Sequence, residues 1–476
     1  MTARTRHQAG ENPDAGREDE DRMSPLERRA SISLAGIYTL RLLGLFMILP
    51  VFSLHADEYP DFSPARLGLA IGIYGLTQAC FQVPFGLLSD RVGRKRVISG
   101  GLIVFVIGSV MAALADTMTG VIVGRAIQGT GAIAAAVLAL TADLTREEQR
   151  TKAMAIIGVS IGFAFAVAMV LGPVVAEPFG MSGLFWFTGA LAALGLVVLH
   201  TGVPDPAVSR FHRDTEPVPS QFARILRNAD LVRLDVGILV LHLVMTAIFV
   251  ALPLALRDAA GLAETRHWLF YLVVLLAAVL LMAPFVRYAD KANQLKPVFL
   301  GAVAVMMLAL AGLGVGGAVA GLLAVGVLMT LFFASSTILE ATLPSIVSRI
   351  APAAMKGTAL GVYSTSQYLG AFLGGWAGGL LYEQFGGPGV YLTCAGLCVV
   401  WFAVAFGMRN PPPLSIRLLN LGAVTPGQES ALEQRLKAVV GVVEASVIAE
   451  DGMAYLKVDR RRLDHAALRA FSAAAA

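Results

Sequence analysis

The sequence predicts an all-α membrane protein with twelve transmembrane helices in two six-helix bundles, followed by a small C-terminal α+β ferredoxin-like domain. Of the 476 residues, 56% are hydrophobic and only 15% are charged, whereas about 25% of a soluble chain is charged. Long apolar runs of about 20 residues have the length that crosses a bilayer. A Pro-Phe pair followed by an acid-base pair occurs at 84–91 and again at 284–291. This repeat indicates two related halves.

The first 30 residues are polar and mixed in charge, without the apolar region of a signal peptide. Residues 1–30 are therefore expected to form a disordered cytosolic tail. The first bundle is predicted over 31–205, a Pro- and Arg-rich cytosolic linker over 206–230, and the second bundle over 231–409. The predicted spans are 31–54, 66–89, 96–115, 119–143, 152–176, 182–203, 231–256, 268–288, 298–317, 319–346, 357–383 and 388–408.

The distribution of Lys and Arg predicts the orientation in the inner (plasma) membrane. These residues gather in the loops after the second, fourth, eighth and tenth spans, whereas the first loop is acidic. The loop after the seventh span breaks the pattern with Arg257 and Arg266. Because cytosolic loops carry the excess of basic residues, both termini are expected in the cytosol. The net charge of +4 therefore reflects membrane topology, and no nucleic-acid partner is predicted.

Residues 414–472 have the character of a small soluble domain. Strand-like and helix-like segments follow in the order β-α-β-β-α, with a hairpin turn signal at Asp451-Gly452. This order is that of a nearly complete ferredoxin-like unit. No CxxC pair follows the first strand, and a pair of thiols alone makes a poor metal site. No metal or cofactor is predicted, since the three cysteines, Cys80, Cys394 and Cys398, all lie in apolar runs.

The loop after the second span carries the most specific motif in the chain. A first glycine lets two helices approach closely, an acid lies at the membrane edge, and a second glycine permits a tight reversal. The basic cluster that follows would hold the loop at the cytosolic surface. The residues in question are Gly86, Asp90, Arg91, Gly93, Arg94, Lys95 and Arg96.

This run resembles the signature loop G-x-x-x-D-R-x-G-R-[KR]-[KR] of the major facilitator superfamily, whose architecture would cover residues 31–409. The resemblance implies that Asp90 belongs to a charge relay that closes the cytosolic side in the outward-facing state. The implied partners are basic groups of the same loop, Asp143 at the end of the fourth helix, and a residue of the eleventh helix.

The fourth span resembles a motif of proton-coupled exporters in the same superfamily, R-x-x-Q-G-x-G. Arg125 and Gln128 occupy its polar positions, and Gly129 and Gly131 occupy its glycine positions. An arginine several residues inside a span is costly and needs a buried partner or water. The alternative is an arginine that extends its side chain to the membrane surface.

The fifth span contains Leu171-Gly172-Pro173, which resembles the core of the superfamily's antiporter motif. The family pattern continues with further glycines, where this sequence has Val174-Val175-Ala176. Packing of small residues around a proline kink would explain Gly172 and Pro173 equally well.

Three more ionisable residues, Arg41, Glu340 and His242, lie within spans. The resemblance places their helices around a central cavity and makes them, with Arg125, candidates for proton coupling. Glu340 is the preferred carrier, because a carboxyl in a low-dielectric surrounding can load and unload a proton. Pairing with an arginine is the alternative for Glu340, and packing is the alternative for His242. Neutral candidates for the cavity wall, or for hydrogen bonds between helices, are Tyr74, Gln78, Gln82, Gln128 and Gln367.

A closer resemblance is to the YajR branch of the superfamily, on residues 143–155, 166–173 and 339–344 and on the C-terminal domain. It implies a proton-driven exporter with a cytosolic appendage. The sequence thus favours antiport of protons against small amphipathic or drug-like molecules, by alternating access of two bundles. A proton-coupled uptake symporter and a membrane sensor that signals through the C-terminal domain are the alternatives.

No catalytic residue and no enzyme activity are predicted. The sequence has no G-x-x-x-x-G-K-[ST] loop, which disfavours an ATP-driven pump. Two dissimilar halves give no ring of equivalent filter groups, which disfavours an ion channel. The expected partners are a small-molecule substrate, protons and the lipid bilayer. Self-association through the C-terminal domain is a further expectation.

Overall fold

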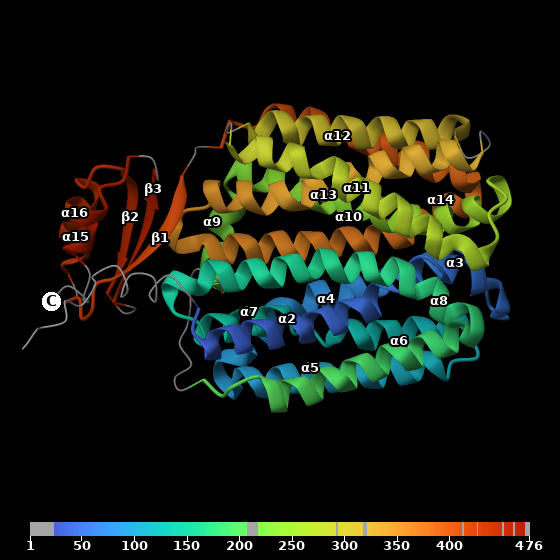
Figure 1. Cartoon of the computed structure of the whole chain (residues 1–476), viewed down its shortest axis with the longest axis horizontal. Helices are drawn as coiled ribbons and strands as arrows, with labels where there is room; N and C mark the ends of the chain where they lie inside the picture. The colour runs from blue at the N-terminus through green and yellow to red at the C-terminus, as the bar shows by residue number, and fades with distance from the viewer. Residues whose placement is uncertain are drawn as a thin grey trace, which may run out of the picture.

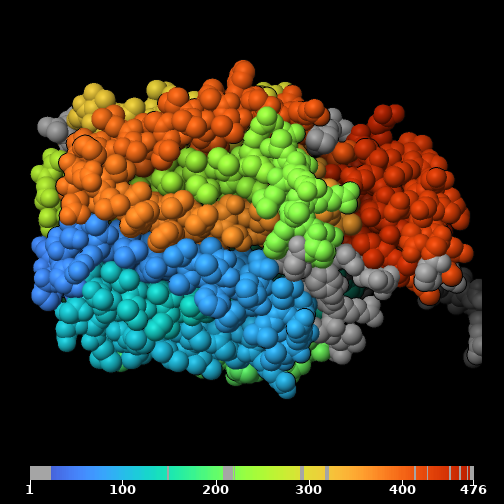
Figure 2. Space-filling view, turned by 180° about the vertical axis from the view of Figure 1, so that it is seen from behind, coloured from blue at the N-terminus to red at the C-terminus, as the bar shows by residue number. Residues whose placement is uncertain are grey.

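The computed structural model describes residues 23–206, 218–291, 294–317, 321–411, 414–425, 427–449, 452–459 and 462–471. Its long helices run side by side, and the C-terminal strands and short helices lie at one end of them (Figure 1). The helices before residue 206 form one side of the long part, and most of the later helices form the other side (Figure 2).

The helices of the first half are α2 (Pro25–Phe46), α3 (Phe52–His55), α4 (Pro64–Val92), α5 (Arg94–Ala113), α6 (Met118–Thr130), α7 (Ala134–Asp143) and α8 (Glu147–Gly202). Those of the second half are α9 (Phe222–Leu226), α10 (Ala229–Leu254), α11 (His267–Lys291), α12 (Leu295–Gly312), α13 (Leu322–Ile350) and α14 (Lys356–Phe406). Two π-helical turns, Ala255–Ala259 and Leu313–Gly317, extend α10 and α12.

Nine helical segments of the described residues are long and apolar enough to cross a membrane. Two of them, α8 and α14, each contain two predicted spans, because the chain reverses at Gly180 (φ 61°) and Gly386 (φ 64°). Glycine suits these positions, since a positive φ is unfavourable for other residues. With α2, which carries Arg41, the twelve predicted spans are accounted for, and the predicted fold class is confirmed.

The two reversals are built in the same way. A Phe-Gly pair at 179–180 and at 385–386 is followed three residues later by a second glycine, Gly183 or Gly389. A Cβ on either second glycine would lie 2.2 Å from the Cβ of the preceding phenylalanine, which is too close for any larger residue. The same turn in both halves is a second sign of the internal repeat, and it becomes evident only in three dimensions.

Several boundaries differ from the prediction. Of the tail predicted over 1–30, residues 1–22 lie outside the described residues, whereas α2 already begins at Pro25 behind the capping box of Ser24 and Glu27. The span predicted over 119–143 is interrupted at Gly131, whose ψ of 54° breaks the helix into α6 and α7. Of the predicted linker, 207–217 lie outside the described residues, while its end already forms α9 and the start of α10.

The two halves meet where α4 packs against α14 with very little space between the backbones. A Cβ on Gly68 would lie 2.1 Å from the carbonyl oxygen of Gly375, and a Cβ on Gly72 would lie 2.6 Å from that of Phe372. A Cβ on Gly75 would likewise lie 2.5 Å from the carbonyl oxygen of Tyr368. Small residues allow such close packing of membrane helices. The contact lies in the first part of α4, far from the basic loop that follows that helix.

The C-terminal segment folds as β1 (Ser415–Asn420), α15 (Glu429–Lys437), β2 (Val442–Ile448), β3 (Met453–Val458) and α16 (His465–Arg469). The predicted order β-α-β-β-α is therefore confirmed. The described strands form one antiparallel sheet in the order β1-β3-β2. One face of the sheet packs on the helices through buried residues that include Leu436, Leu456 and Leu468.

The other face of the sheet contacts the corner between α13 and α14. Lys457 is buried and donates to the carbonyl of Ile350, the last residue of α13, at 3.2 Å. Glu444 pairs with Lys457 at 3.3 Å and accepts from the backbone nitrogen of Ala353 at 3.4 Å. A cation at a helix C-terminus is favourable because it complements the helix dipole. The small domain is thus attached to the second bundle by specific polar contacts.

We predict that Gly68→Leu will hold α4 and α14 apart, because the new side chain would overlap the backbone of α14. Overpacking of this kind costs about 1–3 kcal/mol, enough to shift a two-state equilibrium roughly fivefold or more towards the conformation in which these helices separate. Labelling of a cysteine introduced at the α4–α14 contact should become correspondingly faster.

Gly100→Leu is the matched control, since no atom lies within 4 Å of a Cβ at that position. Equal labelling rates in the Gly68 and Gly100 variants would show that the close contact does not limit the conformational equilibrium.

Candidate functional site

The basic loop between α4 and α5 is organised around Arg94. Its guanidinium is almost fully buried and pairs with Asp90 and with Asp143, the latter at 3.3 Å. It also donates to the hydroxyl of Ser89 at 2.8 Å. Gly93, at φ 107°, provides the reversal that turns the arginine back towards the end of α4. The structure thus brings together the predicted Asp90, Arg94 and Asp143.

The remaining residues of the loop motif have other surroundings. Gly86 packs close to α7, where its Cβ would lie 3.1 Å from the Cβ of Ala135. Lys95 reaches the exposed Asp205 at 2.8 Å, after the end of α8, and this ion pair lowers the pKa of Asp205. Arg91 and Arg96 are exposed, as basic residues at an anionic lipid surface would be.

A polar cluster lies inside the first bundle around the fully buried Arg41. One terminal nitrogen of its guanidinium donates to Gln78 Oε1 at 2.6 Å and to the carbonyl of Gly131 at 2.9 Å. That carbonyl lies at the break between α6 and α7, where the helix is interrupted. The guanidinium also packs over the ring of Tyr74 at 5.7 Å. Gln82 extends the cluster, since its Oε1 accepts from Gln78 at 3.4 Å.

Arg125 also contacts the ring of Tyr74, with its guanidinium 5.1 Å from the ring centre. It donates to Gln128 Oε1 at 3.0 Å and to backbone carbonyls of α4. Gln128 in turn donates to Ser109 at 2.8 Å. Both arginines are therefore buried among amides, carbonyls and aromatic faces, and Arg125 does not extend to the membrane surface.

The second bundle holds the other predicted residues in one group. His242 Nε2 lies 3.2 Å from Glu340 Oε1 and 2.8 Å from Gln367 Nε2, so α10, α13 and α14 meet at this imidazole. His242 Nδ1 faces the carbonyl of Ile238 at 3.3 Å. The Glu340 side chain keeps 36% of its surface exposed. Its partner in the structure is thus a histidine, rather than the arginine considered as an alternative from the sequence.

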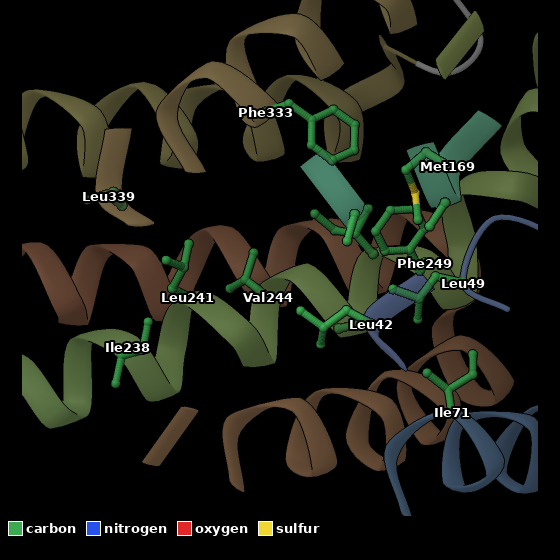
Figure 3. Packing of buried hydrophobic residues seen from close by; sticks show 14 of the residues in the cluster. Leu42, Leu49, Ile71, Met169, Ile238, Leu241, Val244, Phe249, Phe333 and Leu339 are labelled. Atoms are coloured by element: carbon green, nitrogen blue, oxygen red, sulfur yellow. The ribbon is translucent and has the colours of Figure 1, made fainter. Parts of the chain in front are cut away.

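Aromatic side chains fill the space between the bundles next to this group. Phe165 of α8 lies 6.4 Å from Phe249 and 6.1 Å from Phe333, and the last two rings are 6.3 Å apart. Figure 3 shows Phe249 and Phe333 together with Met169 of α8. Phe249 follows His242 by seven residues, and Phe333 precedes Glu340 by seven. The aromatic trio therefore lies about two helical turns from the His242–Glu340 pair, on the side away from the basic loops.

Gly172 and Pro173 lie within α8, where the helix packs against the end of the first span. A Cβ on Gly172 would lie 2.4 Å from the carbonyl oxygen of Met47 and 3.0 Å from Pro50 Cγ. The close approach explains why a small residue is needed at this point. The role in antiport that the motif suggests stays a prediction.

Sequence reasoning missed the buried Glu27, because it lay within the segment taken for a tail. Its carboxylate accepts from the backbone and side chain of Arg146, at 2.8 to 3.2 Å, and so joins α2 to the loop before α8. Burial raises the pKa of Glu27, but hydrogen bonds from Arg146 and Ser24 outweigh that effect and hold the pKa at about 2. The sequence Ser24-Pro25-Leu26-Glu27 fits a capping box and could have revealed it.

Comparisons with known proteins agree with this architecture. The sequence model of the Major Facilitator Superfamily matches residues 34–375 and 236–439. The chain is 45% identical over 440 residues to "Inner membrane transport protein YajR" of Escherichia coli (strain K12), which covers 92% of this chain and 96% of that protein. It is 25% identical to "Multidrug resistance protein MdtH" of Aeromonas salmonicida (strain A449), over 74% of this chain and 87% of that one.

Among solved structures, one similar fold is that of a bacterial homologue of the human lysosomal transporter Spinster, in an inward-facing and occupied conformation. The TM-score is 0.68 at 14% sequence identity, with 81% of this chain and 97% of the other covered. This likeness concerns the fold alone. The resemblance seen in the sequence motifs is confirmed by the family match and by the similarity to YajR.

Arg94→Ala is predicted to destabilise the protein, because it removes the buried cation that both Asp90 and Asp143 contact. Breaking such a buried ion pair from one side costs about 3–5 kcal/mol. Thermal unfolding of the purified protein in detergent should therefore begin at a clearly lower temperature.

The control is Arg96→Ala in the same loop, since Arg96 is exposed and an exposed charge contributes little to stability. If both variants unfold at the same temperature as the wild type, Arg94 does not organise the loop.

Proposed function

Since this chain belongs to the Major Facilitator Superfamily of membrane transporters, we propose that it couples proton movement to the export of a small amphipathic or drug-like molecule. The observation that carries the proposal is the His242–Glu340 pair within the second bundle, held by Gln367. The aromatic trio lies about two helical turns further from the basic loops. Ionisable residues inside a membrane are costly and are kept mainly for function.

The contacts of His242 support a proton-dependent change of partner. A neutral imidazole with its proton on Nδ1 donates to the carbonyl of Ile238 and accepts at Nε2 from Gln367. A protonated imidazole carries a proton on both nitrogens and can donate from Nε2 to Glu340. Because Glu340 and Gln367 both lie next to Nε2, gain or loss of one proton selects between them.

Access to this pair depends on which end of the bundles is closed. The α4–α14 contact and the aromatic trio close the end away from the basic loops. In the proposed cycle the exposed part of Glu340 takes up or releases its proton on the side of the basic loops. Separation of α4 from α14 and closure around Asp90, Arg94 and Asp143 would present the same group to the opposite side, which is alternating access.

Neutralisation of Glu340 would lower the cost of moving between the two states. An ionised carboxylate that loses water while the bundles rearrange is expensive in a membrane interior, and a neutral carboxyl is much less so. Proton binding from one side and release to the other would therefore allow the transition. Binding of the small molecule in the same space would exclude the proton. The protein would then carry either the proton or the small molecule through each transition, but not both.

The nature of the substrate and the location are supported by the relatives. The protein named multidrug resistance protein MdtH supports a drug-like substrate for this chain. The protein named inner membrane transport protein YajR supports an inner-membrane location, with the basic loops and both termini in the cytosol. Uptake symport remains the alternative direction of coupling.

A sensing role is a second candidate, and the attachment of the C-terminal domain favours it. Lys457 and Glu444 contact the corner between α13, which carries Glu340, and α14, which carries Gln367. A movement of these helices would therefore be transmitted to the sheet through these contacts. Signalling would then add to transport or replace it.

We expect compound-dependent proton release in everted membrane vesicles that contain the wild-type protein, measured with a pH-sensitive dye and a panel of amphipathic compounds. In Glu340→Gln the release should fall at least tenfold, because the amide cannot carry a proton. Glu383→Gln is the control, since Glu383 is an exposed acid at the turn between the last two spans.

Release that is unchanged in Glu340→Gln would remove Glu340 from the coupling mechanism. A wild-type protein that is folded and yet moves no protons with any compound, in either direction, would reject proton-coupled transport and favour the sensing role.

A further inference from the structure

The loop after the seventh span carries two arginines on the side away from the basic loops, where an excess of basic residues is not expected. Arg257 is neutralised within the loop, because its guanidinium pairs with Asp258 at 2.7 Å and with Glu264 at 3.3 Å. Arg266 is exposed, and no acid pairs with it among the described residues. Arg266 therefore presents a charge at the membrane surface that a ligand could neutralise.

Arg266 borders a cavity of about 800 Å³ between the first halves of α11 and α13. Binding sites for small molecules commonly have volumes of about 300–1,000 Å³. Among the described residues that line the cavity, Arg266 is the only charged one. The other polar side chain is Thr330, whose hydroxyl is already occupied, since it donates to the carbonyl of Gly326 at 2.8 Å. The rest of the lining consists of leucine, valine, phenylalanine and glycine.

The cavity has a buried wall and a side that is open to lipid. Phe270 and Val274 of α11 are buried, whereas Val273 of α11 is 58% exposed and Leu323 of α13 is 83% exposed. Gly326 leaves room between the two helices, since a Cβ at this position would lie 3.8 Å from the ring of Phe270. An apolar groove with an open side on a membrane-spanning helix pair is accessible to acyl chains.

The groove extends from the membrane surface into the apolar interior. Arg266 immediately precedes α11, and Val273 and Val274 follow it by seven and eight residues, which places them about 10–12 Å deeper. On α13 the lining runs from Leu322, the first residue of the helix, to Leu331. A cation at the surface and an apolar groove below it match the phosphate and the acyl chain of a phospholipid. Guanidinium groups bind phosphate through charge-assisted hydrogen bonds, and basic pockets between membrane helices bind anionic headgroups.

We propose that this cavity is a binding site for a phospholipid with an anionic headgroup, taken from the leaflet on the side away from the basic loops. The phosphate pairs with Arg266, and one acyl chain lies in the groove between α11 and α13. A zwitterionic phospholipid carries a cation next to its phosphate, so it binds more weakly. The inference goes beyond the proposed function and does not depend on proton coupling.

Photoactivatable phosphatidylglycerol, with the reactive group on its acyl chain, tests the site in the full-length protein in phosphatidylcholine nanodiscs. After illumination and digestion, mass spectrometry should find the label on residues 269–274 and 322–331. Phosphatidylethanolamine with the same chain should label these segments about fivefold less, which is the effect of about one arginine at a charged membrane surface. Arg266→Gln should reduce labelling by phosphatidylglycerol by a similar factor. Arg287→Gln is the matched control, since Arg287 is an exposed arginine towards the other end of α11.

A second variant tests the groove while the charge is kept. Gly326→Leu should reduce the labelling of both segments about fivefold or more, because the new side chain would occupy the space next to Phe270 that the acyl chain needs. Gly301→Leu on α12 is its control, since no atom lies within 4 Å of a Cβ at that position.

Equal labelling by the two lipids would overturn the proposal, and this comparison uses the wild type, so it holds even if a variant fails to fold. Unchanged labelling in Arg266→Gln would show an arginine that only extends into water, and unchanged labelling in Gly326→Leu would show that the chain lies outside the groove. Either result contradicts the site. Segments that remain unlabelled while two copies of the chain crosslink there would identify a second copy as the occupant and reject the lipid.

Discussion

The contact between α4 and α14 determines much of the architecture, because it joins the two halves at one end with almost no space between their backbones. Glycines at 68, 72 and 75 leave the carbonyls of α14 within contact distance. In a membrane, where the hydrophobic effect does not drive helices together, such packing is a main source of association. The aromatic trio of Phe165, Phe249 and Phe333 fills the neighbouring space. In the proposed cycle, this packing closes the end of the protein away from the basic loops.

The polar groups follow from the cost of charge in a membrane. Arg94 is buried against two carboxylates, and Glu27 is buried against Arg146, both near the side of the basic loops. Deeper in the first bundle, Arg41 donates to Gln78 and to the carbonyl of Gly131 at the interruption of the fourth span. In the second bundle the carboxyl of Glu340 lies 3.2 Å from the imidazole of His242. The first bundle thus holds fixed cations, whereas the second holds groups that can change charge.

Much of this organisation could be predicted from the sequence. The membrane spans are predicted by the length of the apolar runs, and the two halves by the internal repeat. The β-α-β-β-α order is predicted by the alternation of apolar residues and by the turn at Gly452. The set Asp90, Arg94 and Asp143 was expected from the motif. These features depend on local composition or on short spacing, which a single sequence contains.

Other features depend on contacts between distant segments and could not be predicted. Gln367 lies 125 residues from His242 in the sequence, and nothing local indicates that the two meet. The interruption at Gly131 carries no proline to mark it. Glu27 lies in the polar segment predicted as a tail, and its partner Arg146 is 119 residues away in the sequence. The glycines of α4 were indistinguishable from those that only pack within one bundle.

The central claim is that the two bundles exchange which end is closed, and distances between spin labels across the bundles test it most directly. One pair, at Asp116 and Glu383, reports the end that the structure shows closed, and another, at Arg96 and Arg287, reports the basic-loop end; all four residues are exposed. The account predicts that a change of pH lengthens one distance and shortens the other. Distances that stay fixed, or that change in the same direction at both ends, would contradict it.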